Sequence, residues 1–593
     1  MVAFLKWVGS IFTGAVTGLL KFIVATILLL LVVVIGLAVY GASKGDRIPS
    51  NVVLALDLRK EMVDSTPTSF SFGDHPQTVM DIVLGLDAAE RDNRVKGVFV
   101  RVGNGALSIA RAEEIKAALK KFRTSGKFVI VHAQGFDGAG LGDYLAATAA
   151  DEIWMQPKSS FAASGVGGGQ LFLRGLLDKI KAEPQIVKRA EYKSAADMYM
   201  ESGMTKENRE QLEALMQSWY DAAVDDAAKD RKLSHDAMIA ALEASPQFTE
   251  DAKAKKLIDR VGYDDDALNA ALSRAGDKAQ AMTFAQFMGP KPDNSFGSGP
   301  HVALVEASGE IVEGSSNSGP FGGDTVIAGD DMARAIRQAT ADKDVKAIIL
   351  RVDSPGGSVT ASDQILDAVK KAQAAGKPVV VSMGSVAASG GYYISLSANK
   401  IVAEPGTITG SIGVLTGKIA IGGTLGLVGV KGEMVGVGKN ALMNSDLQPY
   451  TADQLKAVNA EADAIYNDFT QKVSDGRKLT LAKVQDIARG RVWSGADAAE
   501  RGLVDKLGGF WDAVDIAKKL AGIPQGDHVT FKVYPRQKGM FEALKALFGN
   551  DDEVEAIENF NTLMHAPAVG QVVRAVKSAP RANIELRATN LPE

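Results

Sequence analysis

Two loops rich in glycine and serine hold the residues whose types and spacing suit catalysis. The first is Asp353-Ser-Pro-Gly-Gly-Ser-Val-Thr360, and the second is Ala387-Ala-Ser-Gly-Gly-Tyr-Tyr393. Adjacent glycines ahead of a helix allow backbone N–H groups to turn toward one point, which suits an oxyanion. Ser389 stands among small residues that leave room for a substrate carbonyl. Together the loops indicate a serine nucleophile beside an oxyanion site, whose candidate amides are those of Gly356, Gly357 and Gly390.

A serine nucleophile needs a base, and the region around Ser389 offers no histidine. A serine–histidine–aspartate triad uses histidine, but none lies between His301 and His528. A lysine can replace it if its pKa falls from about 10.4 to ~7–8, at a cost of roughly 4 kcal/mol. Burial and hydroxyl acceptors can produce that shift.

The composition excludes several other chemistries. The 593 residues include no cysteine, which removes cysteine nucleophiles and thiolate metal sites. The six histidines show no metal-ligand spacing, so we expect no metal and no other cofactor. A net charge of −5 gives no basic surface for nucleic acid.

Strands and helices alternate around the two loops. Residues 347–352, 378–383 and 400–403 are apolar runs typical of buried strands, residues 359–375 have helical spacing, and residues 387–397 indicate a short helix. This alternation predicts βαβ units and an α/β fold with a mainly parallel sheet. Functional loops lie at the ends of the strands in such sheets.

The chain contains one pattern twice. Residues 95–102 overlay residues 345–352 at an offset of 250, and the offset is 246 at Thr205 and Thr451. A self-match of this length predicts two domains of one fold rather than a solenoid. We call the two copies repeat one and repeat two.

The two copies differ at the positions that suit chemistry. Ser389 corresponds to Leu141 or Ala139, depending on where the offset changes, and Ser411 corresponds to Ala163. The glycine pair of repeat two corresponds to alanine and leucine in repeat one. Repeat one therefore cannot supply a serine nucleophile.

These residues resemble the signal peptide peptidase A (protease IV) family of membrane-anchored bacterial serine peptidases, in its long, duplicated form. The motifs are Ala-Ser-Gly-Gly-Tyr at Ser389, Tyr-Lys-Ser-Ala at Lys193 and Thr-Gly-Ser-Ile-Gly at Ser411, and the resemblance covers most of the chain. It implies tandem copies of the ββα superhelix that Clp protease and crotonase share. The expected fold class is thus α/β, with two such repeats and an N-terminal transmembrane helix.

The resemblance also implies roles for the site residues. Ser389 is the expected nucleophile, Lys193 the general base, and Ser411 the residue that orients Lys193. Because repeat one keeps the lysine but lacks the serine, we expect the dyad to be assembled across the two repeats. Lys439 is a rival base, since Lys193 aligns with either Ala441 or Lys439.

One segment is apolar enough to anchor the chain in a membrane. Residues 22–43 carry no charge and can cross a bilayer as a helix. The run exceeds the ~7–15 apolar residues of a signal peptide, which favours an uncleaved anchor. The expected organisation is an N-terminal segment (1–21), the anchor (22–43), repeat one (51–288), a linker (289–300), repeat two (301–526) and a C-terminal extension (527–593).

Charges on the two sides of the anchor are balanced, so the positive-inside rule does not orient it. The resemblance implies a single pass through the bacterial inner membrane, with the repeats on the extracytoplasmic side. It further implies a homotetramer and hydrophobic peptide substrates, such as signal peptides left in the membrane.

Three functions were weighed. The favoured one is a membrane-anchored serine endopeptidase. A crotonase-like acyl-CoA enzyme would share the fold but needs carboxylates, which the residues after Ser389 do not supply. A membrane scaffold without activity would predict decay of the motifs in both repeats, whereas repeat two keeps them all.

Overall fold

The computed structural model describes residues 48–65, 77–105, 107–136, 140–289, 295–297, 299–316 and 326–535. The expected anchor (22–43) and most of the C-terminal extension lie outside these residues. Within the described ranges, no helix has the length and apolar character that crossing a membrane requires.

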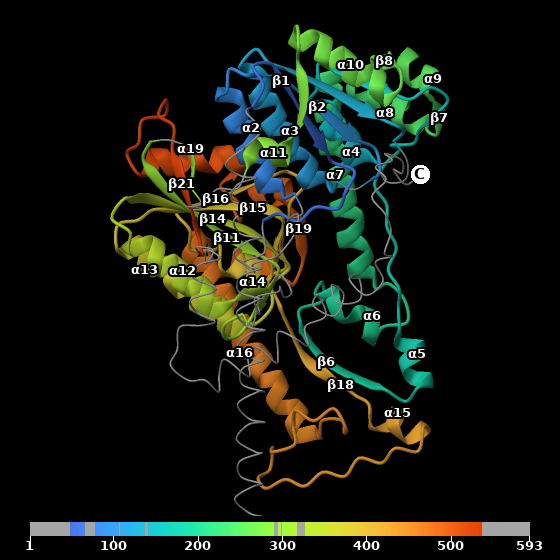
Figure 1. The fold of residues 1–593 in the computed structure, drawn as a ribbon. Coiled ribbons are helices and arrows are strands. Elements are labelled where there is room, and N and C mark those ends of the chain that lie inside the picture. The colour runs from blue at the N-terminus through green and yellow to red at the C-terminus, as the bar shows by residue number, and fades with distance from the viewer. Residues whose placement is uncertain are drawn as a thin grey trace, which may run out of the picture.

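Repeat one is built on a six-stranded sheet in the order β8-β4-β3-β2-β1-β9, with every neighbouring pair parallel (Figure 1). Its central strands are runs of valine, isoleucine and phenylalanine that helices cover, as expected of a parallel sheet. The strands of repeat one are β1 Val52–Asp57, β2 Val95–Val102, β3 Phe128–Ala133, β4 Glu152–Met155, β5 Ser160–Phe161, β6 Glu183–Arg189, β7 Gln247–Phe248, β8 Arg260–Val261 and β9 Gln280–Thr283. The helices are α2 Val79–Arg91, α3 Ile109–Thr124, α4 Leu141–Ala147, α5 Arg174–Lys179, α6 Asp197–Met200, α7 Lys206–Arg231, α8 His235–Glu243, α9 Thr249–Ala254, α10 Asp264–Ala275 and α11 Phe284–Met288.

Repeat two is built on a nine-stranded sheet whose main path is β10-β21-β11-β14-β15-β16-β20, with β17 pairing to β15 and β19. Of these strands, β10 lies in the expected linker (289–300) and β21 in the expected C-terminal extension (527–593). The strands are β10 Ser295–Gly297, β11 His301–Ser308, β12 Glu310–Val312, β13 Val326–Ala328, β14 Val345–Ser354, β15 Val379–Ala388, β16 Lys400–Ala403, β17 Ile408–Gly410, β18 Val414–Ala420, β19 Val492–Ser494, β20 Lys506–Leu507 and β21 Thr530–Tyr534. The helices are α12 Gly329–Ala341, α13 Val359–Ala374, α14 Gly390–Tyr393, α15 Gly422–Leu427, α16 Ala452–Arg477, α17 Leu481–Ile487, α18 Gly495–Glu500 and α19 Phe510–Leu520. The predicted α/β class with mainly parallel sheets is confirmed.

The duplication is visible in matching helices. α7 and α16 each have 26 residues, begin after a threonine whose side chain accepts a backbone N–H, and end at a lysine with left-handed backbone. The caps are Thr205 and Thr451, which is where the two sequences align. Equal caps at both ends give the two helices equal lengths.

One predicted boundary is wrong. Residues 387–397 were expected to form a helix, but β15 continues to Ala388 and α14 begins at Gly390. The reason is that Val386, Ala387 and Ala388 pair in parallel with β17. The strand therefore runs up to Ser389.

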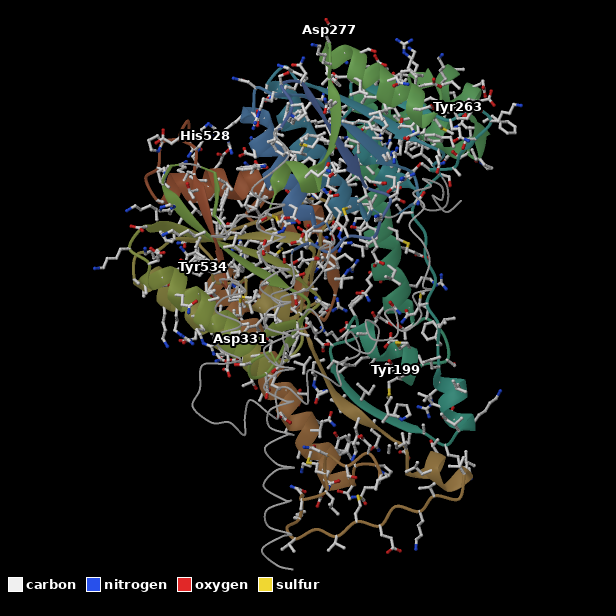
Figure 2. The ribbon with its side chains drawn as sticks, in the orientation of Figure 1. Tyr199, Tyr263, Asp277, Asp331, His528 and Tyr534 are labelled. Carbon is white, nitrogen blue, oxygen red and sulfur yellow. The ribbon has the colours of Figure 1, made fainter. Side chains whose placement is uncertain are left out.

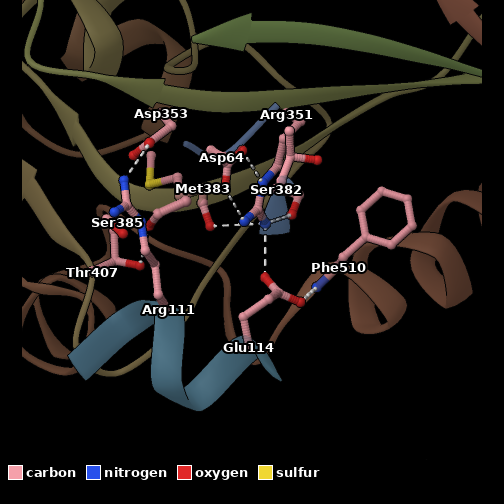
Figure 3. Close-up of polar contacts among 12 residues, drawn as sticks. Asp64, Arg111, Glu114, Arg351, Asp353, Ser382, Met383, Ser385, Thr407 and Phe510 are labelled. Carbon is pink, nitrogen blue, oxygen red and sulfur yellow. Dashed lines mark hydrogen bonds and ion pairs between the residues drawn. The ribbon is translucent and has the colours of Figure 1, made fainter. Parts of the chain in front are cut away.

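The two repeats pack against each other around a buried arginine (Figure 3). Arg351 on β14 is 2% exposed, and its guanidinium lies 2.7 Å from Asp64 and 2.8 Å from Glu114 of repeat one. Glu114 also accepts the backbone N–H of Phe510 at 2.8 Å. Breaking such a buried pair by removing one partner costs about 3–5 kcal/mol, so this network fixes how the repeats are docked.

A second junction lies away from the sheets. β6 of repeat one pairs antiparallel with β18 of repeat two, from Arg189 opposite Val414 to Glu183 opposite Ala420 (Figure 1). Figure 2 shows Tyr199 of α6 at the end of repeat one that carries β6, far from Tyr263 and Asp277 at the opposite end. The chain leaves β6 and enters the segment that carries Lys193 directly.

Candidate active site

Ser389 lies in a sharp turn between a strand and a helix. It follows β15, precedes α14, and has φ 54° and ψ −115°. Positive φ is uncommon for a residue with a side chain and stores about 1–3 kcal/mol. The Ser389 N–H donates to the Gly410 carbonyl at 2.9 Å, and the Ser389 carbonyl accepts from the Tyr393 N–H at 2.8 Å. These bonds hold the turn against its strain.

Lys193 of repeat one reaches this serine across the junction. Its Nζ lies 3.1 Å from Ser389 Oγ, 2.9 Å from Ser411 Oγ and 2.9 Å from the Ser411 carbonyl oxygen. The lysine is 6% exposed. Among the described residues no carboxylate forms an ion pair with it, and burial lowers the pKa of Lys193 to about 8. A sizeable fraction of this lysine is therefore neutral at physiological pH.

The backbone around Lys193 is held by residues 489–491 of repeat two. The Tyr192 N–H donates to the Arg489 carbonyl at 3.1 Å, and the Ser411 N–H donates to the Arg491 carbonyl at 2.8 Å. Gly490 lies between them with φ +73°, and a Cβ there would come within 2.7 Å of the Lys193 backbone nitrogen. Only glycine permits this close approach.

The two glycine-rich loops meet beside Ser389. A Cβ on Gly356 would lie 2.6 Å from the Gly390 nitrogen, and a Cβ on Gly390 would lie 3.0 Å from the Gly357 nitrogen. The Gly390 N–H begins α14, so the helix itself does not satisfy it. The Gly356 N–H instead donates to Ser354 Oγ at 3.2 Å. Of the three amides named from the sequence, the structure thus leaves those of Gly357 and Gly390 for an oxyanion.

In repeat one the corresponding loop binds a carboxylate of the chain itself. Asp143 is fully buried and accepts from the N–H groups of Gly103 at 3.0 Å, Gly105 at 2.7 Å and Leu107 at 3.1 Å. Leu107 is the counterpart of Gly357. Asp143 therefore occupies the amides of this loop in repeat one, and Leu141 has no hydroxyl to act as a nucleophile.

The rival base lies elsewhere. Lys439 is 76% exposed, and its Nζ forms an ion pair with Asp453 at 2.9 Å. It is not part of the buried cluster around Ser389.

Sequence reasoning missed Gly490 and Asp143. Gly490 lies in Arg-Gly-Arg, whose only signal is a glycine between two long side chains. Asp143 gave no signal, because its function depends on three amides that precede it by about forty residues.

Comparison with known proteins places the chain in a family. The model of peptidase family S49 matches residues 121–277 and again residues 371–524. The Clp protease model matches residues 328–405, which include Ser389 and the two glycines before α13. This supports a Clp protease-like α/β fold for repeat two.

Three relatives agree with the family match. Protease 4 of Salmonella typhi is 32% identical over 557 residues, which is 88% of this chain and 87% of the relative. Serine protease SPPA, chloroplastic, of Arabidopsis thaliana is 31% identical over 82% of this chain and 71% of its own. The putative signal peptide peptidase SppA of Enterococcus faecium is 32% identical over 33% of this chain and 57% of its own. The chain is a serine peptidase and belongs to peptidase family S49, as a long, two-repeat member of the signal peptide peptidase A (protease IV) family.

Proposed function

We propose that this chain is a membrane-anchored serine endopeptidase that degrades hydrophobic peptides, such as cleaved signal peptides, with a Ser389–Lys193 dyad assembled from its two repeats. The observation that carries the proposal is the contact of 3.1 Å between Nζ of the buried Lys193 and Ser389 Oγ. The two residues are 196 positions apart, and neither repeat contains both. The name of the Enterococcus faecium relative, which describes a signal peptide peptidase, supports the substrate class.

The proposed reaction begins when Ser389 Oγ attacks the carbonyl carbon of the peptide and its proton passes to Lys193 Nζ. A neutral lysine has two N–H groups and one lone pair. Its N–H groups donate to the Ser411 Oγ and carbonyl oxygens, each at 2.9 Å, which turns the lone pair toward the Ser389 hydroxyl. Ser411 thus orients the base.

The oxyanion formed by the attack would accept the N–H groups of Gly390 and Gly357, which are fixed before the substrate arrives. Lys193 then gives its proton to the leaving amine, and the C–N bond breaks. In the second half, Lys193 takes a proton from water, the hydroxide attacks the acyl ester, and Ser389 leaves with that proton.

The remaining placement follows the family resemblance. Residues 22–43 would anchor the chain by a single pass in the bacterial inner membrane, with both repeats on the extracytoplasmic side. Signal peptides remain in that membrane after they are cut from secreted proteins. An anchored active site would therefore meet substrates at the bilayer.

Two unpaired segments support the proposed homotetramer. β18 of repeat two pairs with β6 of repeat one inside the chain. The counterpart of β18 in repeat one is residues 166–172, and the counterpart of β6 in repeat two is residues 429–437. Neither segment forms a strand pair among the described residues. Both are exposed, with Leu171 at 80%, Val435 at 95% and Val437 at 97%. If 429–437 of one copy pairs with 166–172 of the next, the pairing repeats around a closed ring.

The proposal is tested with full-length protein in detergent micelles and a fluorogenic hydrophobic peptide. Ser389→Ala and Lys193→Ala should each lower kcat/KM by at least about 1,000-fold. Lys439→Ala is the matched control and should stay within about twofold. Full activity of Ser389→Ala would exclude this nucleophile, and loss of activity in Lys439→Ala alone would place the base in repeat two.

A further inference from the structure

We propose that Gln211 is a positioning residue that holds Lys193 in line with Ser389 and Ser411. The inference rests on the proposed Ser389–Lys193 dyad and adds a residue to it. Gln211 lies on α7 and is 2% exposed. Its side-chain amide joins the lysine segment of repeat one to a strand of repeat two.

The donor end of the amide binds the residues on both sides of the lysine. Gln211 Nε2 donates to the Tyr192 carbonyl oxygen at 3.1 Å and to Ser194 Oγ at 2.7 Å. Both bonds are short enough to restrain their partners, which are the Tyr192 backbone before Lys193 and the Ser194 side chain after it. A single amide group therefore helps to set the direction in which the Lys193 side chain leaves the backbone.

The acceptor end of the amide binds β19, which pairs with the strand β17 that lies beside the two serines. Gln211 Oε1 accepts from the Val492 N–H at 3.2 Å. Val492 pairs with Gly410 in β17, and Gly410 accepts the Ser389 N–H at 2.9 Å. Ser411 follows Gly410 directly. The Gln211 side chain thus links the segment of repeat one that carries Lys193 to the strands β17 and β19 of repeat two that hold Ser389 and Ser411.

This bridge matters because the two residues of the dyad lie 196 positions apart in the chain. Lys193 and Ser389 approach from different repeats, so their 3.1 Å contact depends on packing across the junction. A displacement of about 1 Å in such a site costs on the order of 100-fold in rate. The backbone bond from Tyr192 to Arg489 restrains one side of Lys193 only, whereas Gln211 restrains both.

The duplicated chain offers an internal comparison. At the offset of 246, Gln211 of α7 corresponds to Ala457 of α16, which is exposed and has no side-chain amide. The cap three positions before Asn208 matches its counterpart in repeat two, so the two helices are in register here. The glutamine therefore occurs in the helix that contacts the Lys193 segment and is absent at the equivalent position of α16.

The test compares Gln211→Met, Ser194→Ala and the control Gln247→Met in full-length protein. Gln247 is also a buried glutamine of repeat one; its Nε2 donates to a backbone carbonyl at 2.8 Å, and its Oε1 accepts from Lys255. Loss of its bonds should lower the melting temperature without changing kcat. Each variant is measured for melting temperature, kcat, KM and the pH dependence of kcat/KM.

Gln211→Met should lower kcat about 10- to 100-fold at pH 7, with KM within about twofold. The rising limb of its kcat/KM profile should move to higher pH, because a displaced Lys193 is better solvated and stays protonated up to a higher pH. Ser194→Ala should show the same shift at smaller size, and it decides the question if Gln211→Met does not fold.

An unchanged kcat and pH limb in folded Gln211→Met, or in Ser194→Ala when Gln211→Met is unfolded, would overturn the inference. Equal losses of kcat in Gln211→Met and Gln247→Met would do the same. The proposed dyad is judged separately, because Ser389→Ala and Lys193→Ala would remain inactive in either case.

Discussion

Raising the pH should switch on the activity over a range that the burial of Lys193 defines. Lys193, the proposed base, can accept a proton only when it is neutral, and burial lowers its pKa from 10.5 to about 8. We therefore expect kcat/KM to rise about tenfold per pH unit below pH 8 and to level off above it. The cause is desolvation of the amine, since the oxygens that accept its hydrogen bonds are uncharged.

The size of the effect follows from the neutral fraction of the lysine. With a pKa of about 8, roughly one Lys193 in ten is neutral at pH 7, against about one in three thousand at the ordinary pKa of 10.5. Between pH 6 and pH 9 the neutral fraction rises about 90-fold for the buried lysine and about 1,000-fold for an unshifted one. The presence of a plateau therefore separates the two cases.

The assay is hydrolysis of an uncharged fluorogenic peptide from pH 5.5 to 10.5 at constant ionic strength. Melting temperature is recorded at each pH to exclude loss of folded protein. Ser411→Ala should move the limb, because it removes one of the acceptors at 2.9 Å from Nζ. A limb that continues to rise through pH 10, or a maximum below pH 7, would refute the reasoning.

Three further predictions concern stability and packing. Lys193→Met should abolish activity yet raise the free energy of unfolding at pH 7 by about 3 kcal/mol. Because Lys193 binds fewer protons in the native state than in the unfolded chain, this gain should vanish by about pH 10.5. Urea titrations at pH 7 and 10.5 would show both results. Burial raises the pKa of Glu113 to about 8, so native stability should fall as pH rises from 4.5 to 8. Glu113→Gln should therefore melt higher than wild type at pH 9 and equally at pH 4, and no difference at pH 9 would contradict this. Gly490→Ala should lower kcat at least about tenfold, since its Cβ would lie 2.7 Å from the Lys193 nitrogen; Gly522→Ala, with positive φ and open space, is the control.

Local sequence patterns predicted the parts of the site that lie within a few residues of one another. The apolar runs placed β14 and β15, and the glycine and serine pattern marked the loop at Ser389. Even there, the end of β15 was misplaced, because Ala387 and Ala388 pair with residues of β17 that lie 22 positions later. Strand pairing is non-local, and a run of small residues does not reveal it.

The contacts between the repeats could not be predicted from the residues alone. Arg351 was expected only as part of a strand, yet it is buried because Asp64 and Glu114 approach it from the other repeat. Gln211 belongs to the same class, since a glutamine on a mostly polar helix is usually a solvated residue. A single sequence carries periodicity along the chain but not the partner that each face meets.

The division of the proposed dyad between two repeats would have a physical consequence for when the enzyme is active. The pKa of Lys193 is lowered because the lysine is buried, and the residues around it include Ser411 and Gly490 of repeat two. Before the repeats dock, the amine would be solvated and its pKa would lie near 10.5, so almost none of it could accept the Ser389 proton. Docking would thus lower the pKa of the proposed base as well as bring its amine to Ser389. A chain that has not finished folding would hold an unactivated serine, and its activity should appear together with the Arg351 network rather than with the folding of either repeat.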